Sequence, residues 1–224
     1  TKTFVSAYSF GLGLISTPVY AATLLLDDLP LVHIKDEFFI KTRGDILIHL
    51  AAIPITTIIV FFIGVFAVFS LLRFFGFEKE APLAVVLVFI GTPIIHYMTY
   101  DLTYTHAVEA GLLCLAFYAF YKQKSPFWTG IALGLMTVVR YSSAPFILPF
   151  LVVAYRANKR DAVKLLAGFA PLVLLLPLYF AAQYGSPFSF GGYRLSPTDF
   201  SVLPVHIPTV LFSTVRDPPS LLLW

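Results

Sequence analysis

Long uninterrupted stretches of apolar residues dominate the chain, and they predict helices that cross a membrane. Five stretches lack Lys, Arg, Asp and Glu altogether: 46–72, 81–100, 125–139, 141–155 and 165–193. A helix needs about 20 mainly apolar residues to cross the hydrocarbon core of a bilayer, and several of these stretches are long enough. Strands of a membrane barrel would alternate apolar and polar residues, whereas "TTIIVFFIGVFAVFSLL" does not alternate. The pattern therefore predicts an all-α, polytopic transmembrane helical bundle.

The bundle is expected to contain six to seven membrane helices. Six predicted spans lie at 46–73, 82–99, 103–121, 126–139, 141–155 and 164–183. Residues 4–26 are also uncharged, but Pro18 interrupts them, so a shallow or re-entrant position on the outer side is favoured over a full crossing. The stretches on either side of Arg140 reach only about 22 Å as helices, so they either tilt or share a kinked hairpin.

Composition supports the same class of protein. Hydrophobic residues make up 58% of the chain and charged residues 12%, with a mean hydropathy of +0.86, whereas a soluble domain carries roughly 25% charged residues. The single cysteine, Cys114, excludes an internal disulfide. Because the chain begins with Thr1 and stops within "SLLLW", we expect residues 1–224 to form a single transmembrane domain of a longer protein. This piece would lack the N-terminal helix with the first external loop and the C-terminal part.

Basic residues predict the orientation of the spans. The loops "RFFGFEKE" (73–80), "YKQK" (121–124) and "YRANKRDAVK" (155–164) alternate with the spans and hold eight of the 15 Lys and Arg residues. Because basic loops favour the cytoplasmic side, residues 96–106, Arg140 and the part after Gln183 are predicted to be extracytoplasmic, at the plasma membrane if the organism is prokaryotic. The lipid bilayer is thus an expected partner. Nucleic acid is not, because no Lys/Arg face is formed.

Candidate chemistry gathers in "HYMTYDLTYTH" (96–106) and just beyond it. Glu109 follows His106 at i+3, so both side chains share one helix face. Ionisable side chains within spans usually face the bundle interior, which predicts a cavity shared by His106, Glu109 and Asp101. The tyrosines could instead form an interfacial belt, Asp101 could cap a helix, and the histidines could be ordinary interface residues. Two ligands do not close a zinc site, so no metal ligand is assigned, and a divalent cation stays open.

Arg140 interrupts "GIALGLMTVVRYSSAPF" on the side that carries few basic residues. A guanidinium forks onto phosphate oxygens, and Tyr141, Ser142 and Ser143 add donors in the adjoining turn. These residues predict an anion site. The alternative is that the Arg140 side chain extends along the helix to the membrane interface.

Five segments, taken in order, resemble segments of polyprenyl-phosphate-sugar-dependent glycosyltransferases of the GT-C fold, in particular protein O-mannosyltransferase-like (glycosyltransferase family 39) and aminoarabinose-transferase-like proteins. The segments are "SAYSFGLGLISTPVY" (6–20), "GTPIIHYMTYDLTYTHA" (91–107), "GIALGLMTVVRYSSAPFILP" (130–149), "QYGSPFSFGGY" (183–193) and "LFSTVRDPPSLLLW" (211–224). Together they extend over nearly the whole chain. Phe10 stands where the family usually has Pro, and "VRDPPS" replaces its usual Arg-Gly-Leu.

The resemblance implies an inverting hexosyltransferase or mannosyltransferase. It would move a sugar from a polyprenyl-phosphate donor to a lipid, glycan or protein acceptor on the extracytoplasmic face. It implies a catalytic role for Asp101, at the place of an acid in the family's second external loop, and the family's main catalytic Asp would precede Thr1. His106 and Glu109, which share the predicted cavity, complete the candidate catalytic residues. The residues expected to bind substrate are Arg140, Tyr141, Lys2, Tyr8, Tyr100 and Tyr104. No cofactor is assigned. Two alternatives remain: a non-catalytic membrane subunit or degenerate relative, and a transporter or flippase with polar residues in broken helices at the bilayer midplane.

Overall fold

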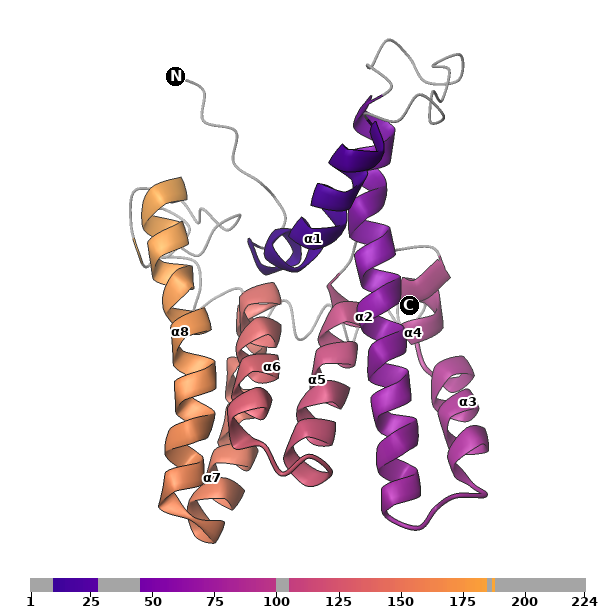
Figure 1. The fold of residues 1–224 in the computed structure, drawn as a ribbon, viewed down its shortest axis with the longest axis vertical. Coiled ribbons are helices and arrows are strands. Elements are labelled where there is room, and N and C mark those ends of the chain that lie inside the picture. Colours follow the sequence, from indigo (N-terminus) through magenta and orange to yellow (C-terminus); the bar gives the residue numbers. More distant parts are fainter. Residues whose placement is uncertain (1–9, 28–44, 100–104, 185–186, 188–224) are drawn as a thin grey trace, which may run out of the picture. The chain divides into compact units, whose positions relative to one another are not determined.

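The computed structural model describes residues 10–27, 45–99, 105–184 and 187, and all regular structure among them is helical (Figure 1). The all-α class is therefore confirmed for these residues. The elements are α1 (Phe10–Asp27), α2 (Asp45–Phe74), α3 (Ala81–Gly91), α4 (Ile94–Thr99), α5 (His106–Tyr121), α6 (Pro126–Val139), the 3₁₀ helix η1 (Tyr141–Phe146), α7 (Ile147–Ala157) and α8 (Lys159–Tyr184).

The chain separates into two compact units, one formed by Tyr8–Tyr179 and the other by Thr1–Ala7 with Phe180–Trp224. Of the second unit, the described residues include only the end of α8 and Pro187. The single domain predicted over residues 1–224 therefore stays a prediction.

Two helices within the described ranges are long and apolar enough to cross a membrane. They run over Ala52–Phe74 and Lys159–Ala182, and only 28% and 22% of their most apolar windows are buried inside the protein. The core helix of a soluble protein would be mostly buried. Four further apolar helices are shorter than a full span: Phe10–Thr23, Ala81–Gly91, His106–Tyr121 and Pro126–Val139. The count of six to seven membrane helices stays a prediction beyond the two long ones.

Two of the predicted spans are not continuous α-helices. In the span predicted at 82–99, Thr92 has extended backbone angles (φ −124°, ψ 159°) and separates α3 from α4. The following Pro93 explains this break, because its ring disfavours a helical conformation of the preceding residue. In the span predicted at 141–155, a 3₁₀ helix that contains Pro145 comes first, and α7 begins only at Ile147.

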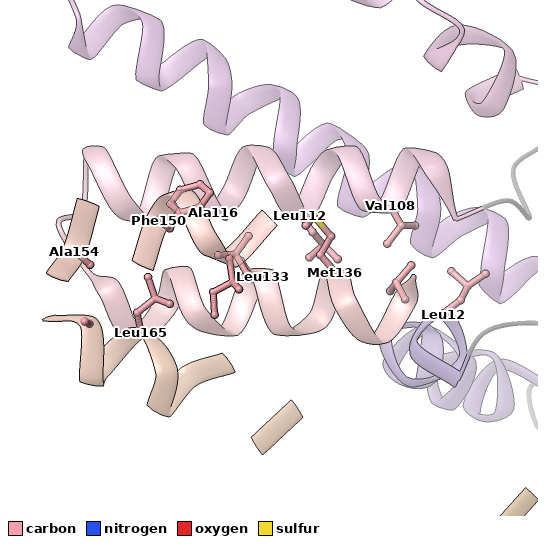
Figure 2. Packing of buried hydrophobic residues seen from close by; sticks show 13 residues of the cluster. Leu12, Val108, Leu112, Ala116, Leu133, Met136, Phe150, Ala154 and Leu165 are labelled. Atoms are coloured by element: carbon pink, nitrogen blue, oxygen red, sulfur yellow. The ribbon is translucent and has the colours of Figure 1, made fainter. Parts of the chain in front are cut away.

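The core of the larger unit lies around α5, which packs against α2 on one side and α6 on the other. Val108, Leu112 and Ala116 of α5 meet Leu133 and Met136 of α6, and all five are nearly or fully buried (Figure 2). These positions recur at i+4 on α5 and at i+3 on α6, so each helix presents one continuous apolar stripe to the other. Residues of α1, α7 and α8 extend the same cluster: Leu12, Ile147, Phe150, Ala154, Ala162 and Leu165.

Glycines allow the helices to approach closely at two crossings. A Cβ atom on Gly111 of α5 would lie 2.6 Å from the carbonyl oxygen of Val60 on α2. A Cβ atom on Gly130 of α6 would overlap the carbonyl oxygen of Leu165 on α8, and one on Gly168 would overlap that of Phe127. Small residues at such contacts are typical of helix packing within membranes, where close backbone approach provides much of the association energy.

Candidate functional site

A polar cluster forms where the start of α5 meets the end of α6. His106 and Glu109 lie on the first turn of α5, Arg140 follows directly after α6, and Ser143 lies in η1. Arg140 has an extended backbone (φ −147°, ψ 103°), which ends the helix and turns the chain into η1. The Ser143 N–H then donates to the Arg140 carbonyl at 2.9 Å. This turn places both side chains beside α5.

The four side chains form one connected hydrogen-bond network, which we call the polar cluster. Arg140 Nη1 lies 2.7 Å from His106 Nδ1 and 3.1 Å from Glu109 Oε2. The Ser143 hydroxyl donates to the other carboxylate oxygen, Glu109 Oε1. His106 Nδ1 lies 4.0 Å from Glu109 Oε2. The structure therefore brings Arg140 together with His106 and Glu109, from which it is separated by 34 and 31 residues in the sequence.

The contact with Arg140 determines which nitrogen of His106 carries the proton. A guanidinium has only N–H donors and no acceptor, so Nδ1 must accept and the neutral ring carries its proton on Nε2. His106 is thus held as an acceptor toward Arg140 and as a donor on its other side. In this form the network contains one positive and one negative charge, on Arg140 and Glu109.

The cluster is partly buried and partly open. The exposed fractions of the side chains are 18% for Glu109, 34% for His106 and 41% for Arg140, while Ser143 is buried. Glu109 therefore lies deepest among the charged groups, and Arg140 is the most accessible. Because a guanidinium has five N–H donors in a planar fork, Arg140 can hold Glu109 and still present donors to an anion at the open side.

Tyr97 on α4 forms an aromatic wall beside this cluster. Its ring centroid lies 4.4 Å from that of His106, with the planes tilted by 38°, and His96 contacts the same tyrosine edge-on at 5.7 Å. Sequence reasoning did not assign Tyr97 to the site and assigned Ser143 only as a donor near Arg140. The signal for Tyr97 was its place in the polar stretch 96–106, and the signal for Ser143 was its position three residues after Arg140 in a turn.

Of the remaining candidate residues, only Tyr141 lies within the described ranges. It belongs to η1 and has an exposed side chain. The other five candidates lie outside the described residues: Lys2, Tyr8, Tyr100, Asp101 and Tyr104. Their predicted roles stay predictions.

An apolar cavity of about 270 Å³ lies between α2, α3 and α5. Its lining includes Ala110, the residue after Glu109, and Ile94 on α4, the helix that carries Tyr97. Phe61, Val65 and Phe89 form part of its apolar wall.

No metal centre is formed by the described side chains. Among residues 10–27, 45–99, 105–184 and 187, no group of three or more His, Cys, Asp or Glu side chains is placed to hold a metal ion. His106 and Glu109 alone supply too few ligands for a closed site.

Comparison with models of known protein families gives no match, and searches of curated proteins and of solved structures also find no relative. The resemblance of the five segments to GT-C glycosyltransferases therefore stays a prediction from the sequence.

Proposed function

We propose that the chain is part of a multi-pass integral membrane protein. The two long apolar helices support this, because most of each apolar window faces away from the protein interior. On α2, Ile59, Phe62 and Phe66 are exposed, and on α3 Leu83 and Ile90 are more than 60% exposed. Such continuous apolar surface is unfavourable in water. The same apolar surface is favourable in contact with lipid. In that arrangement the basic loops would lie on the cytoplasmic side.

Within this class, we propose a membrane glycosyltransferase that takes a sugar from a polyprenyl-phosphate donor at the extracytoplasmic face. The observation that carries the proposal is the polar cluster itself, in which Arg140 is held by Glu109 and His106 at the open end of an otherwise apolar helix pair. The apolar cavity between α2, α3 and α5 suits a hydrocarbon chain, and the five sequence segments favour the same function.

The proposed reaction requires a base, a counter-charge and a sugar-binding wall. The base removes the proton from an acceptor hydroxyl, whose oxygen bonds to the anomeric carbon while the bond from that carbon to the phosphate oxygen breaks. The electrons of the broken bond leave on the lipid phosphate, whose negative charge Arg140 stabilises. Attack opposite the leaving phosphate inverts the anomeric configuration. The Tyr97 ring offers a surface on which a sugar can stack.

The hydrogen bonds of the polar cluster distinguish the roles of the two acids. Both carboxylate oxygens of Glu109 accept hydrogen bonds from Arg140 and Ser143, which makes Glu109 a positioning residue for the guanidinium. We therefore assign proton removal to Asp101. His106 accepts from Arg140 at Nδ1 and carries its proton on Nε2, so in this form it can donate a hydrogen bond but cannot remove a proton. A divalent cation is not required by this scheme.

The proposal is tested by sugar transfer in membranes that contain the full-length protein. Arg140→Ala and Asp101→Asn should each lower turnover by about 100-fold or more, because each removes a group that acts on developing charge in the transition state. Lys79→Ala, which removes an exposed charge in the loop after α2, is the matched control and should keep its turnover. Unchanged turnover in both site variants would contradict the assignment.

One observation favours a second candidate, a non-catalytic membrane subunit. Arg140 and Glu109 form an ion pair at 3.1 Å and neutralise each other's charge. In this second candidate, the sole role of the pair is to join α5 to the end of α6. The paired replacement of Glu109 and Arg140 by glutamine distinguishes the two candidates. A subunit would keep its assembly and the activity of its complex, whereas a glycosyltransferase would lose sugar transfer while remaining folded.

A further inference from the structure

A second apolar hollow lies along the hairpin formed by α7 and α8, which meet at Asn158. It is an open surface groove of about 590 Å³, and Figure 1 shows α7 and α8 joined at the lower end of the view. We call it the hairpin groove. Its lining includes Val152, Tyr155 and Arg156 on α7 and Lys159, Val163 and Leu166 on α8.

The walls of the hairpin groove are apolar and accessible. Val152 is 50% exposed, Tyr155 56% and Val163 65%. Their spacing explains the groove, because residues three and four apart on an α-helix share one face. The two helices thus present adjacent apolar faces with a hollow between them, which would be costly to leave in contact with water.

Two cations lie at the hairpin end of these walls. Arg156 is in the last turn of α7 and Lys159 is the first residue of α8. Among the residues that the structure describes, no carboxylate forms an ion pair with either of them. The acid in the same turn, Asp161, is paired with Lys164 at 3.1 Å. Lys159 Nζ instead lies 5.8 Å from the centroid of the Tyr155 ring.

The hairpin lies at the end of the unit remote from the polar cluster. Phe150 of α7 packs against Phe117 and Phe120, which belong to the last turns of α5, whereas His106 and Glu109 belong to its first turn. The other two basic loops, 73–80 and 121–124, follow the ends of α2 and α5. Lys122 in the second loop donates a hydrogen bond to Ser70 near the end of α2, so the two loops lie at the same end of the unit. In the predicted orientation this end faces the cytoplasmic leaflet, in which anionic lipids gather.

We propose that the hairpin groove binds an anionic phospholipid, with the phosphate between Arg156 and Lys159 and an acyl chain along Val152, Val163 and Leu166. A guanidinium fork and an ammonium group are the donors that phosphate oxygens prefer. Free phosphate is disfavoured as the ligand because it would leave the apolar walls uncovered. A purely apolar helix of a partner protein is disfavoured because it would offer no anion to the two cations. The inference rests on the proposed membrane location and is independent of glycosyl transfer.

The test uses the full-length protein, purified in a neutral detergent and titrated with phosphatidylglycerol or phosphatidylcholine, with bound lipid counted by native mass spectrometry. Wild-type protein should prefer phosphatidylglycerol by about ten-fold, and the pair Arg156→Gln with Lys159→Gln should abolish that preference. The matched control is Arg73→Gln with Lys79→Gln, which removes one exposed cation from the last turn of α2 and one from the loop after it and should retain the preference. An equal loss in the control would overturn the proposal, because the attraction would then be general.

A third variant tests the hydrocarbon part. Val163→Trp fills the groove without changing charge, so it should lower phosphatidylglycerol binding, and inorganic phosphate should not displace the lipid. Displacement by phosphate, full binding by Val163→Trp, or a dimer that this variant disrupts would each overturn the proposal. Carbonate extraction of membranes tests the membrane location separately from lipid binding in the hairpin groove. Release of the protein contradicts membrane location, while retention without lipid preference contradicts only this site.

Discussion

Charged side chains are arranged differently in the polar cluster and at the α7–α8 hairpin. In the polar cluster, Arg140, Glu109 and His106 are partly buried and joined by hydrogen bonds. At the hairpin, Arg156 and Lys159 are exposed, and within the described residues neither forms an ion pair with a carboxylate. Both regions belong to the same helical unit, so the comparison isolates the effect of local surroundings.

The difference follows from the free-energy cost of removing a charge from water. A buried charge is strongly destabilising unless a partner and hydrogen bonds compensate it, and Glu109, at 18% exposure, has both. An exposed cation keeps its hydration and needs no partner. Interlocked charges therefore indicate a structurally fixed site, whereas unpaired exposed cations remain available for an external anion.

The largest expected effect comes from separating the helices that support both regions. Gly130→Ala on α6 should lower the free energy of unfolding by about 3 kcal/mol, because the new methyl group overlaps the Leu165 carbonyl of α8. Thermal or denaturant unfolding in detergent measures the change. Gly13→Ala is the control, since no atom lies within 4 Å of its Cβ position, and it should be neutral or slightly stabilising. Equal losses would show that the close crossing is not required.

An intermediate effect is expected from breaking the ion pair of the polar cluster. Glu109→Gln should destabilise the protein by about 2 kcal/mol, because it leaves the partly buried Arg140 without its counter-charge. Adding Arg140→Gln should restore part of that loss, so a double-mutant cycle should give a coupling of about 1 kcal/mol or more. Additive losses in the unfolding measurements would mean that the two side chains do not stabilise each other.

The smallest effect is expected at the hairpin. Asp161→Asn removes the pair with Lys164, whose side chain is 60% exposed, and should change the free energy of unfolding by about 0.5 kcal/mol or less. Raising the salt concentration should reduce even this difference, because exposed pairs are screened. A loss comparable to that of Glu109→Gln would remove the contrast between the two regions.

Several features of the fold could be predicted from local sequence. The apolar stretch 126–139 coincides with α6 (Pro126–Val139), and 46–73 lies within α2 (Asp45–Phe74), because apolar runs free of charge and bounded by polar turns specify a helix locally. The break between α3 and α4 was not predicted, since 82–99 was expected to form one span, although its cause is local: Pro93 acts on the residue before it. The spacing of His106 and Glu109 placed them on one helix face for the same reason.

Local features of the amino-acid sequence were enough to predict a helical, unusually apolar protein with basic residues in alternate loops. These are properties of composition and short-range periodicity, which do not depend on how the helices meet. The folded arrangement was needed to show that Glu109 and Ser143 hold Arg140, that Tyr97 packs on His106, and that α7 and α8 leave a groove beside two cations. Those contacts join helices far apart in the chain, and helix packing, through close glycine crossings and interlocking apolar stripes, selects which side chains meet.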